Sequence, residues 1–413
     1  MNDTMNRYSS DDQKWVEMNS KHTLFRTSLI QETYIKTIVN QFSQGTKLLE
    51  IACGSGITSV LLNDLGFNVH ATDINRIFIQ NLKEKYAGFE RISFELLDVF
   101  NLDQFVDKGA FDCVIHQGFL EHFSDEDIQK ILRKCSEVSK FSVIDLPNDK
   151  RKNKLQEYGD ERFISVERWC QLFRTSGYEV LAINGRRFEG SLSKISDMLS
   201  DAEKAELGTS TTYLLLSKHF IPHKLHYGCG TVFLEDHLNV DLADDAKVIC
   251  NHNESDNLTT FDNYYKRQFT SIDREKLGIE VDVKCDLNTI AGFETKFDEI
   301  KLIHVFEHVP KYARTNFIEN LARCLSSPQA TLLIAVPDNK AICKLYLESS
   351  SLEEELKYNS WIFGSQRNQY LHHFIGYSYE MLQNVLGSHF DNFQQLDNRN
   401  DYPAIWMTCN KKL

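Results

Sequence analysis

A pattern of strand, glycine turn, strand and acid occurs twice in this chain, and this repeat constrains the fold more than any other feature. The first copy is KLLEIACGSGITSVLLNDLGFNVHATDI, residues 47–74, and the second is KLHYGCGTVFLEDHLNVDL, residues 224–242. Two further pairs recur in the same order: FDCVIHQGFLEHF (111–123) with FDEIKLIHVFEHV (297–309), and FSVIDLPNDK (141–150) with TLLIAVPDNK (331–340). The sequence therefore predicts two copies of one domain, of which the second has the shorter glycine turn.

The length of the chain agrees with two domains. A chain of 413 residues with 42% hydrophobic residues can bury two sizeable cores. The boundary falls near HFIPHK, so we expect a first domain over residues 1–221 and a second over 222–413. A polar and aromatic insert is expected near 251–280.

Short apolar segments alternate with helical patterns in each half, which predicts an α/β fold with a mostly parallel sheet and helices on both faces. One helix is expected over Asp125–Val138. The segments GYEVLAING and TYLLLSK indicate a final strand that returns as a hairpin, antiparallel to the rest. Seven strands are expected in the first half: Lys47–Ala52, Asn68–Thr72, Ile92–Leu96, Cys113–His116, Phe141–Leu146, Glu179–Asn184 and Tyr213–Ser217.

Charge and cysteine content limit the classes of partner. The formal net charge of -13 argues against broad nucleic-acid or membrane-surface binding, and the basic residues around Arg151 are interpreted as the solvated start of a helix. The 10 cysteines form no CxxC pair, so we expect reduced thiols in a cytoplasmic protein. The polar N-terminus does not resemble a signal peptide, and no apolar segment is long enough to span a membrane.

Acidic residues in the first half indicate which nucleotide-type cofactor is bound. Glu50 ends the first strand, Asp73 the second, and Asp98 follows the third, so all three are expected at one edge of the sheet. NAD(P) is the competing cofactor, but its fingerprint has a third glycine where this chain has Ser59. An acid at Glu50 is unfavourable beside a diphosphate and favourable beside a sulfonium and an ammonium group. These residues favour S-adenosylmethionine (SAM).

With these motifs, the chain resembles class I SAM-dependent methyltransferases over nearly its whole length. The first half carries E-x-A-x-G-x-G as Glu50, Ala52, Gly54 and Gly56. The resemblance implies two tandem Rossmann-like seven-stranded sheets with an antiparallel last strand. It also implies that Asp73 binds the ribose and that Asp98 binds the adenine. Neighbouring positions assigned to the cofactor are Ile74, Val99 and Gln117.

The second half resembles a branch of the same family that is often found near surface-polysaccharide genes. Only eleven residues separate Gly230 from Asp241, so the first helix is expected to be short or missing, and no acid stands at His226 or Tyr227. Whether this half binds SAM is left open. The residues that match the branch's cofactor pattern are Gly228, Gly230, Asp241, Asp286 and His304.

Histidines beside the cofactor edge are the candidates for a general base, because a nitrogen or oxygen acceptor loses a proton on methylation. We select His122 in the first half, and His308 and His373 in the second. His116, within an apolar strand, is interpreted as a core histidine. For the His372–His373 pair we expect contact with the acceptor and no metal, because no third ligand stands at a suitable spacing.

The resemblance implies an enzyme that methylates an N or O of a small-molecule acceptor: a natural product, metabolite or sugar intermediate. Two methylations by two domains are one form of this hypothesis. In the alternative, only the first domain is catalytic, and the second is a degenerate module that binds the acceptor or forms a homodimer. An NAD(P)-dependent oxidoreductase is the third interpretation. No nucleic acid and no membrane is expected as a partner.

Overall fold

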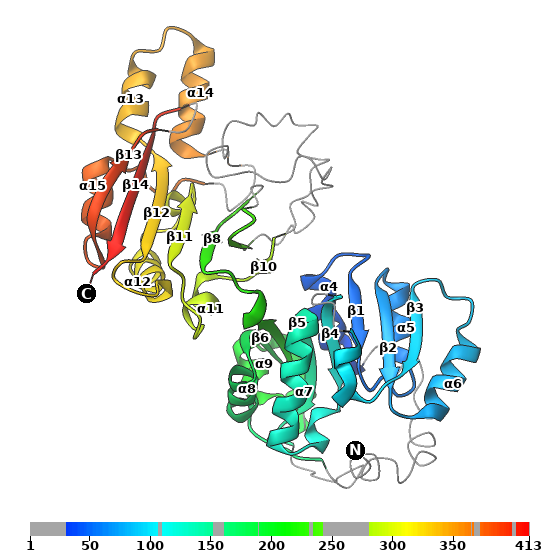
Figure 1. Cartoon of the computed structure of the whole chain (residues 1–413). Helices are drawn as coiled ribbons and strands as arrows, with labels where there is room; N and C mark the ends of the chain where they lie inside the picture. The colour runs from blue at the N-terminus through cyan, green and yellow to red at the C-terminus, as the bar shows by residue number, and fades with distance from the viewer. Residues whose placement is uncertain are drawn as a thin grey trace. The chain divides into compact units, whose positions relative to one another are not determined.

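The protein consists of two compact units, Met1–Ile221 and Pro222–Leu413 (Figure 1). The computed structural model describes residues 30–105, 110–151, 161–188, 190–230, 234–242, 281–364, 366, 372–398 and 402–412. The insert expected near 251–280 lies outside the described residues, as do Trp15 and His22, two N-terminal residues that sequence position alone would allow to cover the cofactor.

Unit 1 is built on a seven-stranded sheet in the order β3-β2-β1-β4-β5-β7-β6. All neighbouring strands are parallel except β7, which runs antiparallel to both β5 and β6. The predicted α/β fold with an antiparallel last strand is confirmed. The strands are β1 (Lys47–Glu50), β2 (Asn68–Asp73), β3 (Ile92–Leu96), β4 (Phe111–Gln117), β5 (Ser139–Pro147), β6 (Tyr178–Arg186) and β7 (Ser210–Ser217).

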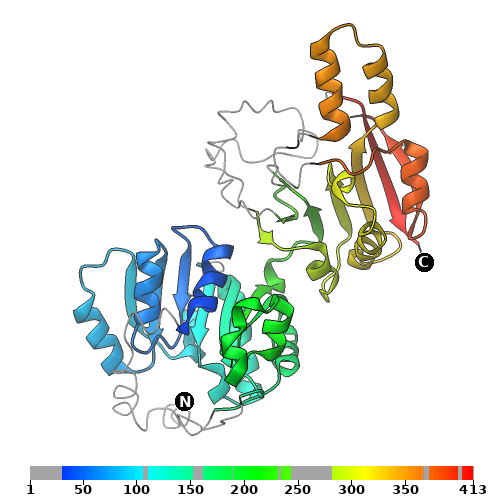
Figure 2. The same cartoon turned by 180° about the vertical axis from the view of Figure 1, so that it is seen from behind.

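Helices cover both faces of the unit 1 sheet: α7 lies in front of it in Figure 1, and α4 in the reverse view of Figure 2. Helix α7 begins where the Ser124 side chain accepts a hydrogen bond from Asp127 N, and it buries Ile128, Ile131 and Leu132 on one face. The α-helices are α4 (Glu32–Gln41), α5 (Ile57–Asp64), α6 (Arg76–Lys85), α7 (Asp125–Val138), α8 (Val166–Thr175) and α9 (Asp201–Leu207).

Unit 2 repeats this architecture strand for strand, with a seven-stranded sheet in the order β10-β9-β8-β11-β12-β14-β13 and an antiparallel β14. Its strands are β8 (Lys224–Tyr227), β9 (Leu238–Asp241), β10 (Val283–Lys284), β11 (Glu299–Ile303), β12 (Thr331–Pro337), β13 (Phe390–Leu396) and β14 (Ala404–Lys411). Its helices are α11 (Leu287–Ala291), α12 (Arg314–Cys324), α13 (Asn339–Leu347), α14 (Leu352–Phe363) and α15 (Tyr379–Leu386).

Unit 2 departs from unit 1 at two places. Where unit 1 has α5 between its first two strands, the described residues 234–237 of unit 2 form only a turn before β9. After β12, helices α13 and α14 stand side by side as a hairpin beyond the end of the strand (Figures 1 and 2). Across the described part of both units, no helix combines the length and the apolar character that crossing a bilayer requires.

Candidate functional site

The turn after β1 holds three residues in the left-handed region of backbone space: Ala52 (φ 53°), Gly54 (φ 53°) and Gly56 (φ 69°). Gly56 is favoured by its backbone conformation, and a Cβ atom there would lie 2.6 Å from Leu82 Cδ2, so the Leu82 side chain would have to shift. This turn brings bare backbone N–H groups to the carboxyl edge of the sheet, where ligands bind in open α/β sheets.

The Asp73 carboxylate lies beside this turn at the end of β2. Its Oδ2 accepts a hydrogen bond from Gly54 N (2.9 Å), and its Oδ1 accepts one from Asn75 N (2.8 Å). Both bonds come from backbone groups, so the carboxylate is held in one orientation before any ligand arrives. The adjacent Ile74, also assigned to the cofactor, is 43% exposed at the same edge.

Asp98 lies at the next position along this edge, because β3 pairs with β2 and places Leu96 opposite Asp73. Asp98 is partly buried, and its Oδ1 accepts a hydrogen bond from Phe100 N (3.0 Å). Val99, which follows it, is also partly buried. The two acids that sequence reasoning assigned to the ribose and the adenine therefore lie at the ends of neighbouring strands.

Glu50 is buried under α5, at 4% exposure, and its carboxylate accepts a hydrogen bond from the Ser59 hydroxyl. Burial, together with the nearby Asp73 carboxylate, raises the pKa of Glu50 to about 8, although the hydrogen bond from Ser59 acts to lower it. Ser59, which stands where the NAD(P) fingerprint has its third glycine, therefore forms a hydrogen bond with the Glu50 carboxylate at the end of the first strand. Near neutral pH this acid is mostly protonated in the free protein.

The end of β4 contributes Gln117, Gly118 and His122. Gln117 Nε2 is buried; it makes no hydrogen bond of standard geometry among the described residues, and its amide lies beside the buried Tyr34 hydroxyl. His122 is partly buried in the short helical turn Leu120–His122. His116 lies inside β4 at 1% exposure, and burial lowers its pKa to about 3, as expected of a neutral core histidine.

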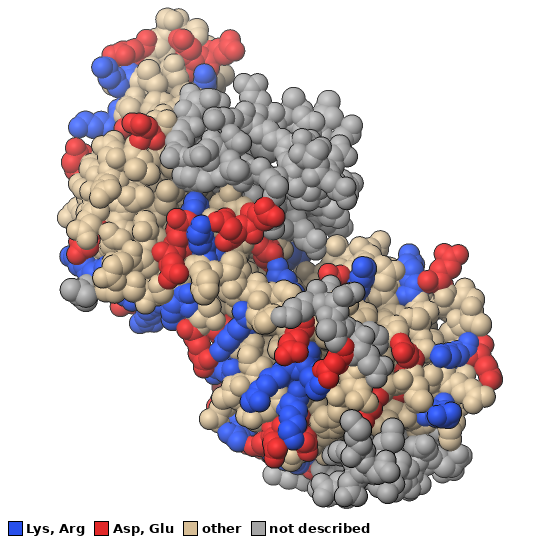
Figure 3. Space-filling view, in the orientation of Figure 1, with Lys and Arg blue, Asp and Glu red and all other residues tan. Residues whose placement is uncertain are grey.

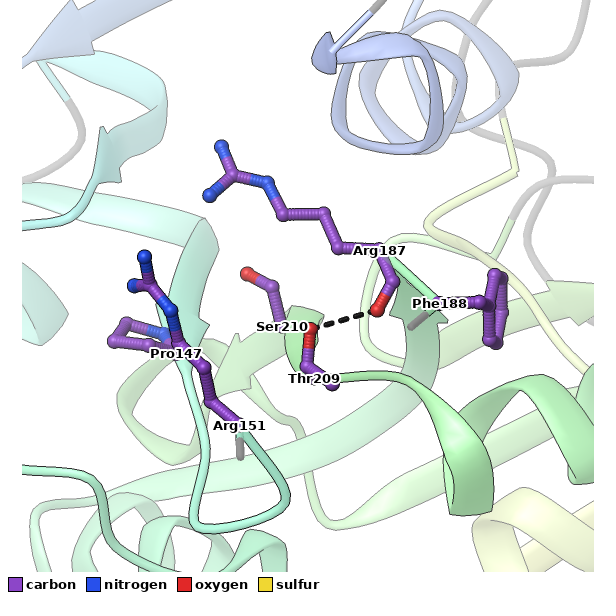
Figure 4. A pocket seen from close by; sticks show the side chains of 6 residues that line it. All are labelled: Pro147, Arg151, Arg187, Phe188, Thr209 and Ser210. Carbon is purple, nitrogen blue, oxygen red and sulfur yellow. Dashed lines mark hydrogen bonds between the residues drawn. The ribbon is translucent and has the colours of Figure 1, made fainter. Parts of the chain in front are cut away.

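A pocket of about 210 Å³ opens beyond the ends of β5, β6 and β7. The ladder pairs Pro147 with Ser210 and Ser210 with Arg186, so this pocket lies at the same sheet edge as Glu50 and Asp73. In Figure 4 the two guanidinium groups and the Ser210 hydroxyl point to the same side, and Phe188 points away. The lining residues are Pro147, Arg151, Arg187, Phe188, Thr209 and Ser210.

Sequence reasoning missed both arginines of this pocket. Arg151 belongs to the basic segment interpreted as a solvated helix start, and Arg187 lies directly after β6. Arg187 has a left-handed backbone (φ 56°), and its carbonyl accepts hydrogen bonds from Thr209 N (3.0 Å) and Thr209 Oγ1 (2.7 Å). The sequence feature that could have identified them is that both arginines follow strand ends at the ligand-binding edge.

Unit 2 reproduces the central contact of the unit 1 site. Gly230 N donates to Asp241 Oδ2 at 2.7 Å, which matches the bond between Gly54 and Asp73. Gly228 (φ 67°) and Gly230 (φ 53°) again have left-handed backbone. Asp286 occupies the place of Asp98 and accepts a hydrogen bond from Thr289 N (2.8 Å) as the cap of α11.

Two substitutions distinguish the second site from the first. His226 stands where unit 1 has Glu50; it is fully buried, and burial lowers its pKa to about 3, so the acid is replaced by a neutral ring. His304 (φ 54°) stands where unit 1 has Gly118 (φ 57°), and both donate a backbone hydrogen bond to the neighbouring strand. An imidazole therefore occupies space that is open in unit 1.

The fold also brings Glu307, His308 and His373 together. One nitrogen of each histidine and a carboxylate oxygen of Glu307 all lie within 4.8 Å of one another. His372, by contrast, contributes its backbone carbonyl, which accepts a hydrogen bond from His308 Nδ1 (2.9 Å). The sequence spacing around His372–His373 showed no third ligand because Glu307 and His308 come from a distant part of the chain.

Comparison with known proteins agrees with this geometry. Residues 48–141 match the model of a family described as a methyltransferase domain. No curated protein sequence gives a significant match to the chain. The prediction of a tandem class I methyltransferase architecture is confirmed: unit 1 contains the segment that matches a methyltransferase domain, and unit 2 repeats the strand order of unit 1. The family match also agrees with SAM as the cofactor.

Similar solved structures include a SAM-dependent methyltransferase from Archaeoglobus fulgidus (16% identity, 50% of this chain and 100% of that one, TM-score 0.40). A second is the complex of the Haloferax volcanii Trm112 methyltransferase activator with a putative methyltransferase (15% identity, 51% of this chain and 98% of that one, TM-score 0.40). A third is magnesium protoporphyrin IX methyltransferase from Synechocystis PCC 6803 with bound SAH (13% identity, 52% of this chain and 98% of that one, TM-score 0.38).

Proposed function

We propose that unit 1 transfers a methyl group from SAM to a nitrogen or oxygen of a small, anionic acceptor. The observation that carries this proposal is the glycine turn whose backbone N–H at Gly54 holds the Asp73 carboxylate, within a domain that matches a methyltransferase family. Sequence position, backbone conformation and hydrogen bonding all support one cofactor edge.

The residues of unit 1 fit the charge and the hydrogen-bonding groups of SAM. Asp73 is oriented to accept hydrogen bonds from ribose hydroxyls, and Asp98 lies one strand further along for the adenine. Glu50 supplies negative charge beside the methionine end, where the ligand is cationic. SAM supplies the activated methyl group, and the protein supplies alignment and a dry site.

The arginine pocket supports an acceptor that carries a carboxylate or phosphate. Arg151 and Arg187 line one cavity, and guanidinium groups pair with such anions through two parallel hydrogen bonds. Neighbouring strands lie about 4.8 Å apart, so β5 is ~10 Å from the glycine turn of β1 across β4. That span suits an acceptor that reaches from the arginines to the cofactor.

His122 is the candidate general base of unit 1. It lies partly buried just past the end of β4, between the strands that carry the cofactor turn and the arginine pocket. In this role it removes the proton that a nitrogen or oxygen acceptor loses when it is methylated. A structural role at the start of α7 is the competing interpretation for this histidine.

A small-molecule acceptor is favoured over a nucleic acid by the charge of the chain. The formal net charge is -13, and in the face drawn in Figure 3 acidic and basic side chains are interspersed over the described surface of both units. We therefore propose no nucleic-acid and no membrane partner, and we propose a cytoplasmic, biosynthetic role.

The test uses the purified full chain with SAM and pools of anionic metabolites, and mass spectrometry detects a gain of one methyl group. We expect Asp73→Ala to abolish the gain, because it removes the oriented carboxylate, while Asp241→Ala serves as the matched control in unit 2. A methylated product that forms equally with wild type and Asp73→Ala would contradict the assignment. Binding of NAD(P)H but not SAM would favour the oxidoreductase interpretation.

A second candidate function concerns unit 2, which we infer is a degenerate module that binds the acceptor or mediates dimerisation. The neutral His226 in place of Glu50 and the imidazole of His304 in place of Gly118 support this over a second methylation. Calorimetric titration of the full chain with SAM decides between the two. If wild type binds one SAM and Asp73→Ala binds none, unit 2 is the non-catalytic module. If wild type binds two SAM and Asp73→Ala and Asp241→Ala each lose one, two methylations are favoured.

A further inference from the structure

Glu307, His308 and His373, here called the His–Glu cluster, come from two segments that the fold of unit 2 holds together. Phe374 N donates to Glu307 O (2.9 Å), and His373 N donates to Phe363 O at the end of α14 (3.1 Å). The first bond fixes the segment that carries His373 to the turn after β11, and the second fixes it to the end of α14. The cluster is therefore positioned by main-chain contacts and does not depend on mobile side chains alone.

Both histidines of the cluster are oriented through one ring nitrogen. His308 Nδ1 lies 2.9 Å from the carbonyl of His372, and His373 Nδ1 lies 3.2 Å from the carbonyl of Ile362. A carbonyl oxygen only accepts, so each Nδ1 carries the proton and each Nε2 is left with a lone pair. Metal-ligating histidines usually have this arrangement, with the second ring nitrogen bonded to a backbone carbonyl or a carboxylate.

The Glu307 carboxylate is the third component. It is 1% exposed; its Oε1 lies 3.3 Å from His304 Nδ1, and its Oε2 has no hydrogen-bond partner among the described residues. A buried carboxylate with one oxygen unsatisfied is costly unless a further partner, such as a cation, completes it.

We propose that unit 2 binds a divalent first-row transition metal ion, such as Zn²⁺, Fe²⁺ or Co²⁺, through His308, His373 and Glu307. Two histidines and one carboxylate are an established ligand set for such ions, and they leave coordination positions open. In a tetrahedral site with bonds of 2.0–2.1 Å, ligand atoms lie about 3.3 Å apart, so the 4.8 Å limit of the cluster needs only a modest contraction.

Unit 1 provides an internal contrast. Arg162 N donates to Glu121 O (2.9 Å), just as Phe374 N donates to Glu307 O, so Glu161 occupies in unit 1 the place of His373. Unit 1 keeps the matching Glu121 and His122 but has a carboxylate where unit 2 has the second imidazole. The histidine at 373 is thus specific to unit 2, and it adds the second imidazole to a ligand set whose other two members have counterparts in unit 1.

The open coordination positions are expected to face the aromatic side of the site. Tyr402 OH lies 3.3 Å from both nitrogens of His304, and its ring stacks on Trp361 at 5.1 Å between centroids. A water molecule or an oxygen donor of a small molecule could occupy these positions. The proposal is independent of whether unit 1 is a methyltransferase.

The experiment starts from the full chain, stripped with a chelator and dialysed, and titrated with Co²⁺ while its visible absorption is followed. We expect one equivalent to bind, Zn²⁺ to displace it, and His373→Ala to weaken Co²⁺ binding by at least about 100-fold, because loss of a ligand exceeds the 10–100-fold effect of an outer partner. His122→Ala, the matched position in unit 1, should bind Co²⁺ as wild type does.

His308→Gln is the second variant, in case His373→Ala does not fold; circular dichroism checks both variants. Uptake of Co²⁺ by wild type and its loss in a folded variant support the site. Absence of Co²⁺ uptake by the folded wild type, or equal binding by wild type and a folded variant of either histidine, would overturn the proposal. Loss of binding in His122→Ala alone would instead point to unit 1.

Discussion

At the scale of single residues, the two units make the same backbone contact above different buried titratable groups. The bond from Gly54 to Asp73 recurs from Gly230 to Asp241 at nearly the same length. Beneath it, unit 1 buries Glu50, with a pKa raised to about 8, and unit 2 buries a neutral His226. We therefore expect Glu50 to stabilise a cationic methionine end in unit 1, and His226 to provide no such charge in unit 2.

Glu50 gives SAM binding a pH dependence. Below pH 8 the free protein holds a proton on Glu50, and a cationic ligand favours the carboxylate, so binding releases this proton. We expect SAM affinity to rise with pH up to about pH 8, by at most about tenfold per unit. Calorimetry in buffers of different ionisation enthalpy measures the proton release. Glu50→Gln should bind SAM more weakly and lack this release; an unchanged pH profile in this variant would contradict the prediction.

The same carboxyl affects stability with the opposite sign. Its folded pKa lies above its unfolded value, so between about pH 4.5 and 8 the native state binds more protons than the unfolded state. The contribution of Glu50 to the free energy of unfolding therefore falls as pH rises through this window. This is why Glu50→Gln should leave the ligand-free protein at least as stable as wild type at pH 8.

At the scale of elements, one buried ion pair joins the strands of the antiparallel edge in unit 1. The Asp145 carboxylate of β5 pairs with the Arg186 guanidinium of β6 and accepts hydrogen bonds from Ser210 (2.9 Å) and Thr212 (2.6 Å) of β7. Burial alone would raise the pKa of Asp145, but Arg186 and Thr212 keep it below its usual value. This pair supports the strands that frame the arginine pocket.

Arg186→Met should destabilise unit 1 by about 3–5 kcal/mol, because it leaves the Asp145 carboxylate buried without its countercharge. Urea unfolding measures the loss. Adding Asp145→Asn to Arg186→Met removes the uncompensated charge, so we expect the double variant to recover part of the lost stability. A double variant less stable than Arg186→Met alone would contradict this interpretation.

At the scale of the whole molecule, the chain carries two units with the same strand order and different sites. Unit 1 combines the glycine turn, the acid pair and the arginine pocket at one sheet edge. Unit 2 keeps the turn but replaces Glu50 with His226, has no counterpart of α5 in its described residues, and adds the α13–α14 hairpin and the His–Glu cluster. The repeat thus kept the scaffold while its ligand chemistry diverged.

Because each unit has its own core, heating should unfold the full chain in two calorimetric transitions, of which SAM shifts one. At a SAM concentration 100 times its dissociation constant, the stabilisation of about 2.7 kcal/mol corresponds to roughly 5–10 °C for a domain of this size. Asp73→Ala should abolish this shift and leave the second transition in place. A shift of both transitions that depends on Asp73 and Asp241 separately would indicate two SAM sites.

Much of the fold was predictable because local patterns determine it. Apolar periodicity located α7, which spans Asp125–Val138 as expected, and the recurring Glu-His and Pro-Asn/Asp landmarks indicated two similar sheets. Asp73 and Asp98 were placed at strand ends, and parallel strands necessarily present those ends at one edge. Their roles in binding the cofactor remain predictions, as do those of His122 and the unit 2 residues.

By itself the sequence determined the repeat, the alternation of strands and helices and the glycine turns, since these depend on residue spacing along one or two neighbouring elements. Only the tertiary structure decided which distant groups meet: Arg151 with Arg187 in a pocket, and His373 with Glu307 and His308 in a cluster. The physical reason is that such contacts join residues tens of positions apart, whose separation in space depends on how loops return to the sheet edge.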